Sequence, residues 1–294
     1  MRIDEPGFST APVGTPRPSG PVNGPADIGG LAAETMLVWW DGPADAFLNM
    51  AADEALAAES LRHGGPVVRF YGWQPTSVSL GAFQRLADAR QVAAIAGTRL
   101  VRRPSGGGAI VHGSDLTYAA AVPKGHSWGG KPQAFYDAFH VALVAELVSR
   151  GFAARRHEAG SAAAATQDGE RFFCFDRRAV GDVVIASGGP PAAGDPKVLG
   201  SAQRRLAGCV LQHGSLLLRA NPGVGAEARH PGLWDIAPEG LAEPRNLAAA
   251  WIGRVAGESG FRAVWQDEGF LATRGARMSI DADRFADETW TGRR

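Results

Sequence analysis

The chain has 294 residues, and its 30 Lys and Arg balance its 30 Asp and Glu, so no overall charge attracts nucleic acid or an anionic membrane. Hydrophobic residues make up 45%, which is enough for a substantial core and well above the level of a disordered chain. The two cysteines, Cys174 and Cys209, cannot build a disulfide framework, which suits a protein of a reducing compartment.

The first 35 residues are predicted to form a flexible tail rich in Pro and Gly, because Met1 to Gly30 lacks the continuous apolar block of a signal peptide. No apolar run approaches the roughly 20 residues that a membrane span needs. We therefore expect a cytoplasmic protein without a membrane or nucleic-acid partner. The folded part is expected over residues 36–265, followed by a C-terminal extension over 266–294.

In the first half of the folded part, strands and helices alternate. A helix is expected from Asp45 to about Arg62, with Phe47, Met50, Ala51 and Leu61 on one side and glycines at its end. A second helix is expected from Ala87 to Ala96. Runs of β-branched and aromatic residues predict strands at Leu37 to Trp40, Val67 to Tyr71, Ser77 to Gly81 and Thr98 to Arg103.

In the second half, Pro132 to Arg150 gives the clearest helical pattern, since Phe135, Phe139, Leu143 and Leu147 recur at every fourth residue. One more helix is expected near Asn246 to Glu258. Strands are expected at Leu116 to Val122, Phe172 to Phe175, Gly181 to Ala186, Lys197 to Gln203 and Val210 to Leu218. Many short strands with two or three long helices predict an α+β domain around a largely antiparallel sheet.

The first candidate for a binding site is the segment from Arg102 to Gly108, in which two arginines precede three consecutive glycines. Such a loop exposes backbone N–H groups that can bind a phosphate or carbonyl oxygen. The alternative is an ordinary turn with two solvated arginines. The glycine spacing matches neither the phosphate-loop nor the dinucleotide-binding pattern.

Cys174 lies between phenylalanines, where a free cysteine is usually a small core residue. It also follows an irregular, polar segment, and Lys197 or Arg171 could stabilise its thiolate, so it is a candidate nucleophile. Cys209 opens an apolar strand and is the weaker candidate. His112 and His213 are too few for a metal site, and His112 is equally suited to acid–base catalysis and to a structural hydrogen bond.

Taken in chain order, these segments resemble the octanoyltransferases and lipoate–protein ligases, which share the biotin/lipoate-protein-ligase fold. The resemblance runs from about Trp39 to Leu218, and its segments begin at Asn49, Arg69, Arg102, Phe173, Lys197 and Gln212. Within that superfamily, Arg69 to Trp73 and the Cys174–Phe175 pair look like the LipM type of octanoyltransferase. The extra loop from Ser187 to Pro196 and the segment after Leu218 depart from the family pattern.

The resemblance implies that Cys174 is the catalytic nucleophile and Lys197 the active-site lysine, with no metal and no cofactor. It also implies an acyl-binding segment made of Arg102, Arg103, Ser105, Gly106, Gly107, Gly108 and His112. The reaction implied is octanoyl transfer from octanoyl-acyl carrier protein, through a Cys174 thioester, to the glycine-cleavage H protein or to lipoyl domains in lipoate biosynthesis.

Two other functions remain open at this point: an ATP-dependent lipoate–protein ligase, and a non-catalytic scaffold that binds lipoyl domains or acyl carriers. Because acyl carrier protein is acidic, a basic docking face is expected. Three arginine pairs are candidates for that face: Arg155–Arg156, Arg177–Arg178 and Arg204–Arg205. Ordinary solvated charge is the alternative reading of each pair.

Overall fold

The computed structural model describes residues 34–158, 171–186, 194–206, 208–237 and 243–293. Within these residues, one large sheet has eight strands. They are β1 (Thr35–Ala44), β2 (Val67–Trp73), β6 (Asp115–Pro123), β7 (Ala154–Arg156), β8 (Val183–Ile185), β9 (Lys197–Leu206), β10 (Cys209–Leu217) and β11 (Arg262–Trp265). Its strand order is β11-β1-β2-β6-β10-β9-β8-β7. Pairing is antiparallel from β2 to β7 and parallel where β1 meets β2 and β11.

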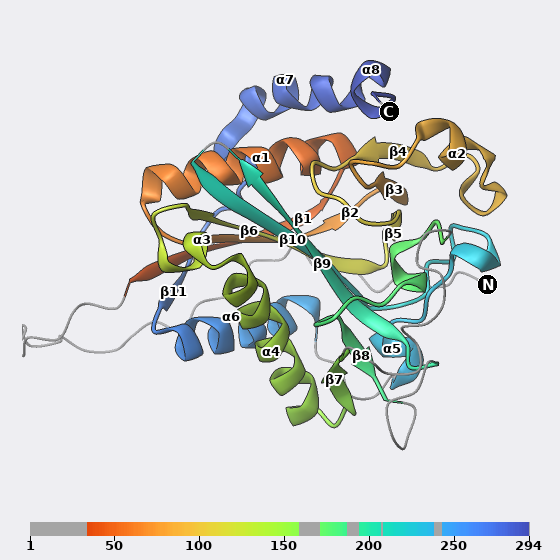
Figure 1. The fold of residues 1–294 in the computed structure, drawn as a ribbon. Helices are drawn as coiled ribbons and strands as arrows, with labels where there is room; N and C mark the ends of the chain where they lie inside the picture. The colour runs from red at the N-terminus through yellow and green to blue at the C-terminus, as the bar shows by residue number, and fades with distance from the viewer. Residues whose placement is uncertain (1–33, 159–170, 187–193, 207, 238–242, 294) are drawn as a thin grey trace, which may run out of the picture.

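A smaller sheet contains β3 (Ser77–Leu80), β4 (Arg99–Arg102) and β5 (Ile110–His112), with β3 between the other two. β3 is parallel to β4 and antiparallel to β5. The predicted α+β class with a mainly antiparallel, mixed sheet is therefore confirmed. In Figure 1 the smaller sheet lies at one end of the large one, beside α2 (Leu86–Gln91).

Helices cover both faces of the large sheet. In Figure 1, α1 (Ala46–His63) lies on one face with α7 (Gly275–Ala286) and α8 (Glu288–Thr291) outside it, and α4 (Pro132–Ser149) and α6 (Pro244–Ser259) lie on the other. The alternation of side chains along β6 explains how one strand serves both layers. Its Leu116, Tyr118 and Val122 pack in the core under α4 and α6, whereas Ala119 and Ala121 pack in the core under α1.

The ends of α1 agree with the prediction. Asp45 caps its first turn by accepting a hydrogen bond from the Phe47 N–H at 2.9 Å, and Gly64 ends it in the left-handed conformation. Leu61, expected on the same side as Met50, is 46% exposed, whereas Met50 is buried. The helices α4 and α6 also confirm the predicted segments.

Three expectations for secondary structure were wrong. The predicted helix over Ala87 to Ala96 divides into α2 and a 3-10 turn, η1 (Ala93–Ile95). Phe172 to Phe175 is not a strand: Phe173 forms one isolated bridge with Ala109, and η3 (Cys174–Asp176) is a 3-10 turn. Only one helix was expected in the C-terminal part, near Asn246 to Glu258, but α7 and α8 follow α6 there.

The remaining short elements are α3 (Ser127–Gly130), α5 (Leu233–Ile236), η4 (Ala226–Ala228) and η5 (Ala272–Arg274). Most of the predicted tail (residues 1–33) and residues 187–193 of the extra loop lie outside the described residues. The division between 36–265 and 266–294 stays a prediction, although Phe270, Met278 and Phe285 are buried in the same core cluster as α1. None of the helices in the described ranges is both long and apolar enough to cross a membrane.

Candidate active site

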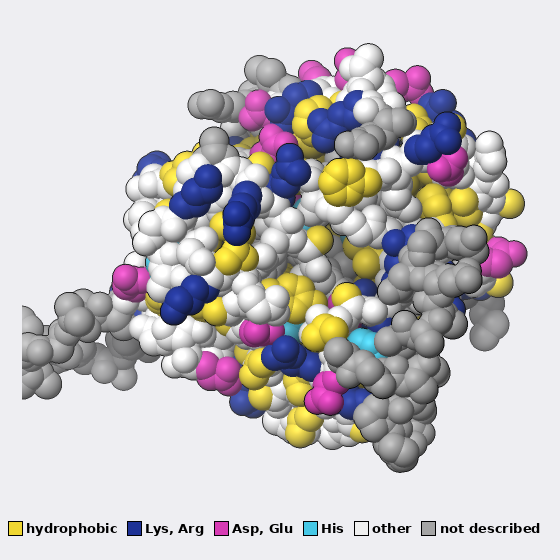
Figure 2. Space-filling model, in the orientation of Figure 1, with side chains coloured by type: hydrophobic (Ala, Val, Ile, Leu, Met, Phe, Trp, Pro, Cys, Tyr) yellow, Lys and Arg dark blue, Asp and Glu magenta, His cyan; other side chains and the backbone are white. Residues whose placement is uncertain are grey.

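A cavity of about 250 Å³ lies between the glycine segment Gly106–Gly108, the start of β9 and the middle of β10. Figure 2 shows the hollow near the centre of this face of the molecule, with hydrophobic side chains around it. Most of the predicted site residues line this cavity: Arg103, Gly106, Gly107, Gly108, His112, Cys174 and Lys197.

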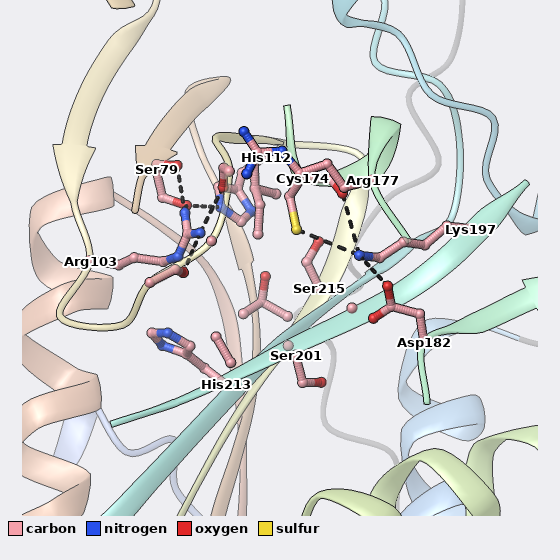
Figure 3. A pocket seen from close by; sticks show the side chains of 18 of the residues that line it. Ser79, Arg103, His112, Cys174, Arg177, Asp182, Lys197, Ser201, His213 and Ser215 are labelled. Atoms are coloured by element: carbon pink, nitrogen blue, oxygen red, sulfur yellow. Dashed lines mark hydrogen bonds and ion pairs between the residues drawn. The ribbon is translucent and has the colours of Figure 1, made fainter. Parts of the chain in front are cut away.

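The side chains of Cys174 and Lys197 point toward each other in the lining of the cavity (Figure 3). The Lys197 Nζ lies 3.6 Å from the Cys174 Sγ and 3.4 Å from the Cys174 carbonyl oxygen. It also forms a 2.8 Å ion pair with Asp182 Oδ2. Cys174 is half-buried, whereas Lys197 is only 5% exposed. The sulfur is therefore accessible from the cavity, while the lysine head is enclosed beside it.

The backbone around Cys174 fixes this position. The Ala109 N–H donates to the Phe172 carbonyl at 2.9 Å, and the Cys174 N–H donates to the Ala109 carbonyl at 2.8 Å. These bonds tie the cysteine segment to the end of the glycine segment. A Cβ atom on Gly108 would lie 2.7 Å from the Cys174 nitrogen, so this close approach needs a glycine. Phe173 and Phe175 are buried, which leaves Cys174 as the side chain at the cavity.

The electrostatics favour the charged form of Lys197. Burial by itself lowers the pKa of its amine, because a charge is costly in a low-dielectric interior. The charges of Cys174 and Asp182 and their hydrogen bonds outweigh burial and raise the pKa of Lys197 above its ordinary value. The site therefore places a fixed ammonium group next to the sulfur.

Arg103 holds the glycine segment in place. Its guanidinium donates to the carbonyls of Ser79, Gly106 and Gly108 at 2.7–2.8 Å. Burial, helped by repulsion from Arg102, lowers the pKa of Arg103 to about 10, so it stays charged at neutral pH. The N–H groups of Gly106, Gly107 and Gly108 have no acceptor within the described part of the chain. They are free to donate to an oxygen of a bound molecule.

Arg102 and Ser105 do not line the cavity, contrary to the expected substrate contact. The guanidinium of Arg102 lies behind the segment and donates to the carbonyls of Gly81, Gln84 and Thr291 at 2.7–2.8 Å. The Ser105 hydroxyl is buried and bonded to His213 Nε2, and His213 itself lines the cavity. The alternative of two solvated arginines is also wrong, since both are buried.

His112 lines the cavity with both ring nitrogens occupied. Its Nδ1 lies 2.8 Å from Asp115 Oδ2 and its Nε2 lies 2.9 Å from the Ser79 hydroxyl, while its ring stacks on Trp73 at 3.9 Å. Thr117 and Ser215 also donate to Asp115, each at 2.7 Å. Burial by itself raises the pKa of Asp115, but these partners outweigh it and lower the pKa. Because these polar groups bond to one another, the cavity suits an apolar ligand.

Asp182 lines the cavity and pairs with Lys197, and sequence reasoning did not single it out. It is buried just before β8, and β8 pairs with the strand that begins at Lys197. The predicted hairpin would not have placed it beside Lys197, because the starts of two antiparallel strands lie at opposite ends of the pair. A lone Asp after Gly181 is otherwise typical of a turn, so proximity to Lys197 becomes evident only in three dimensions.

The chain was compared with known protein families and structures. The family model described as the lipoyl protein ligase A/B catalytic domain matches residues 45–228. The octanoyltransferase LipM of Kyrpidia tusciae is 33% identical over 253 residues, which is 81% of this chain and 86% of that protein. The LipM protein of Moorella thermoacetica is 34% identical over 65% of this chain and 68% of its own length. The LipM protein of Bacillus subtilis is 34% identical over 60% of this chain and 63% of its own length.

Among solved structures, a bi-partite lipoate protein ligase from Thermoplasma acidophilum, studied with its E2 lipoyl domain, aligns with a TM-score of 0.60. It is 19% identical and covers 88% of this chain and 96% of that one. Lipoate-protein ligase A bound with ATP aligns with a TM-score of 0.56 at 18% identity, over 89% of this chain and 99% of that one. At these identities the structures show the fold alone.

Proposed function

The chain belongs to the lipoyl protein ligase A/B catalytic domain family and groups within it with the LipM octanoyltransferases, and on this premise we propose that it transfers an octanoyl group to protein lysines in lipoate biosynthesis. The proposed donor is octanoyl-acyl carrier protein. The proposed acceptor is a lysine of the glycine-cleavage H protein or of a lipoyl domain. The pairing of Cys174 with Lys197 at the cavity is the observation that carries the proposal.

In the first half of the reaction, the Cys174 thiolate attacks the thioester carbonyl carbon of the carrier. A new C–S bond forms at Cys174, the bond to the carrier sulfur breaks, and the carrier leaves as a thiolate that takes up a proton. One thioester replaces another at nearly equal free energy, so this step requires no ATP. The neighbouring Lys197 ammonium stabilises the thiolate form of Cys174.

The tetrahedral intermediate carries a negative charge on the former carbonyl oxygen. Lys197 and the unpaired N–H groups of Gly106, Gly107 and Gly108 border the same cavity and can donate to that oxygen. Loss of one such donor typically raises the barrier by about 3 kcal/mol. This role makes the glycine segment an oxyanion and acyl-positioning element rather than a phosphate loop.

In the second half, the neutral amine of the acceptor lysine attacks the acyl-enzyme carbonyl. The C–N bond forms, the electrons of the C–S bond return to the Cys174 sulfur, and the nitrogen loses its proton to that sulfur or to solvent. The apolar part of the cavity, which includes Met50, Trp73 and Ile110, would hold the acyl chain. Each methylene buried there contributes about 0.8 kcal/mol.

The proposal is tested by incubating the protein with octanoyl-acyl carrier protein and measuring its intact mass. We expect an octanoyl increment in the wild type and in Cys209→Ala, whose sulfur is buried in the core, and no increment in Cys174→Ser. Transfer by Cys174→Ser at the wild-type rate would exclude the covalent mechanism. Pyrophosphate release with free lipoate and ATP would identify a ligase, and binding of carrier without any transfer would identify a scaffold.

A further inference from the structure

In the free enzyme Lys197 contacts two groups that are negatively charged in the proposed mechanism, the Asp182 carboxylate and the Cys174 thiolate. Its Nζ lies 2.8 Å from Asp182 Oδ2 and 3.6 Å from the Cys174 sulfur. The proposed function removes one of these partners during every cycle, because a sulfur that carries an acyl group is a neutral thioester. In the acyl-enzyme, Asp182 is the remaining negative partner of Lys197 within the described residues.

The other titratable groups around this lysine cannot replace the lost charge. From α4, Tyr136 donates its hydroxyl to Asp182 Oδ1 at 3.3 Å, and burial lowers the pKa of His140 to about 3, so His140 is neutral. After η4, burial also lowers the pKa of His230. Arg103, Arg177 and Arg178 line the same cavity and are cationic, so their charges disfavour the protonated form of Lys197.

The carboxylate of Asp182 keeps its place without help from Cys174. Its Oδ2 accepts the Ala179 N–H at 2.7 Å, and its Oδ1 accepts the Tyr136 hydroxyl. Within the described residues, neither of these donors forms a hydrogen bond with the Cys174 sulfur. Acylation of Cys174 therefore leaves the carboxylate where it can still bind the ammonium group.

We propose that Asp182 is a positioning residue that keeps Lys197 protonated during the second half of the reaction, when Cys174 is acylated. In the first half, the thiolate and Asp182 share this task. In the second half, only Asp182 performs it, and the protonated lysine stabilises the oxyanion formed as the amine attacks. Loss of Asp182 should thus slow deacylation far more than acylation. This inference rests on the proposed acyl-enzyme.

The test uses Asp182→Asn, which keeps the side-chain shape but removes its charge. Wild-type and variant enzymes are acylated with octanoyl-acyl carrier protein, separated from the carrier, and treated with hydroxylamine, which gives octanoyl hydroxamate and the free cysteine. Hydroxylamine is used because its amine is far less basic than that of a lysine and is neutral from about pH 7 upward. The rate measured for urea-unfolded acyl-enzyme is subtracted as background.

We expect Asp182→Asn to form its acyl-enzyme within a few-fold of the wild-type rate, as monitored by intact mass. Between about pH 7 and about pH 9, its deacylation rate should fall as Lys197 loses its proton, to about 100-fold below the wild type at the upper end. The wild-type rate should stay flat. Asp137→Asn removes a carboxylate that pairs with Arg156 and does not line the cavity, so it is the matched control and should also give a flat profile.

A flat profile for Asp182→Asn at the wild-type rate would overturn the inference. If this variant fails to fold, the wild-type enzyme provides the test. A wild-type deacylation rate that falls over the same pH range would mean that Asp182 does not keep Lys197 protonated, and would also overturn the inference. Failure of the proposed function gives a different result, because the wild type would then show no octanoyl increment at all.

Discussion

Gly200 leaves the space that the head of Lys197 occupies. A Cβ atom at position 200 would lie 2.5 Å from the Lys197 Cε and 2.7 Å from its Nζ. Both residues belong to β9, three positions apart, so the strand makes room for its own lysine to reach the Cys174 sulfur. The orientation of the lysine therefore depends on a residue with no side chain.

Gly200→Ala should displace Lys197 from Cys174 and Asp182, because separations below 3 Å cannot be accommodated without movement. We expect octanoyl transfer to slow by about 100-fold, as for loss of an oxyanion donor. Steady-state kinetics of both Gly200→Ala and Lys197→Ala, and of the double variant, measure this effect. Since the two changes remove one interaction, the double variant should be no slower than Lys197→Ala.

Gly253→Ala is the matched control for this experiment. Gly253 is exposed on α6, and a Cβ there would meet no atom within 4 Å. Its transfer rate should equal that of the wild type. Additive losses in the Gly200 and Lys197 double variant would show that Gly200 acts by some other route.

The arginine pairs differ in their suitability for carrier docking. Arg155 and Arg156 form ion pairs with Asp195 and Asp137, whereas Arg177 and Arg178 line the cavity beside Cys174. We expect Arg177→Ala to raise the KM for octanoyl-acyl carrier protein several-fold and to weaken its dependence on salt, because a charge contact to an acidic partner is screened by ions. Initial rates at increasing salt concentrations provide the measurement.

Arg205→Ala serves as the comparison for this prediction, since Arg205 is exposed on β9 and does not line the cavity. Its KM and salt dependence should stay close to those of the wild type. An equal effect of both substitutions would argue against docking at the cavity mouth and in favour of a general charge effect.

Arg102 connects the glycine segment to the C-terminal helix α8. Its guanidinium is buried and bonds the Thr291 carbonyl as well as those of Gly81 and Gln84. Arg102→Gln would remove these buried, charge-assisted hydrogen bonds, so we expect a loss of about 2–5 kcal/mol in the free energy of unfolding, measured with urea. The exposed ion pair between Arg90 and Glu288 joins α2 to the same helix. Arg90→Ala should change the free energy of unfolding by less than about 1 kcal/mol.

His140 predicts how stability depends on pH. Burial lowers its pKa in the folded protein to about 3, while its ordinary value in an unfolded chain is about 6.5. Between these values the unfolded state binds the proton and the folded state does not, so the stability contributed by His140 is complete above about pH 6.5 and is lost as the pH falls toward 3. The loss is about 1.4 kcal/mol for each pH unit below 6.5.

Urea unfolding at about pH 7 and about pH 5 measures this loss. His140→Gln, which cannot take up a proton, should lose less stability between the two pH values than the wild type. Equal losses in both proteins would mean that other groups cause the acid sensitivity.

Much of the site could be predicted from sequence because its signals are local. Helical periodicity identified α1, α4 and α6. The family-like segments, taken in chain order, identified Cys174 and Lys197, and the structure places the Cys174 Sγ 3.6 Å from the Lys197 Nζ. The strand expected around Cys174 was wrong, since a hydrogen bond from Arg177 to the Cys174 carbonyl closes a turn there instead. That bond depends on tertiary anchoring of the neighbouring phenylalanines, which periodicity does not reveal.

The sequence by itself determined the α+β class, the family resemblance and the choice of Cys174 and Lys197 as candidate site residues, because these follow from short patterns of residue types. Only the tertiary structure decided that Arg103 supports the glycine segment from the cavity side while its neighbour Arg102 lies behind it. It also brought Asp182 to Lys197. Successive side chains of an extended chain point to opposite sides, and the packing of other segments decides which side becomes the site.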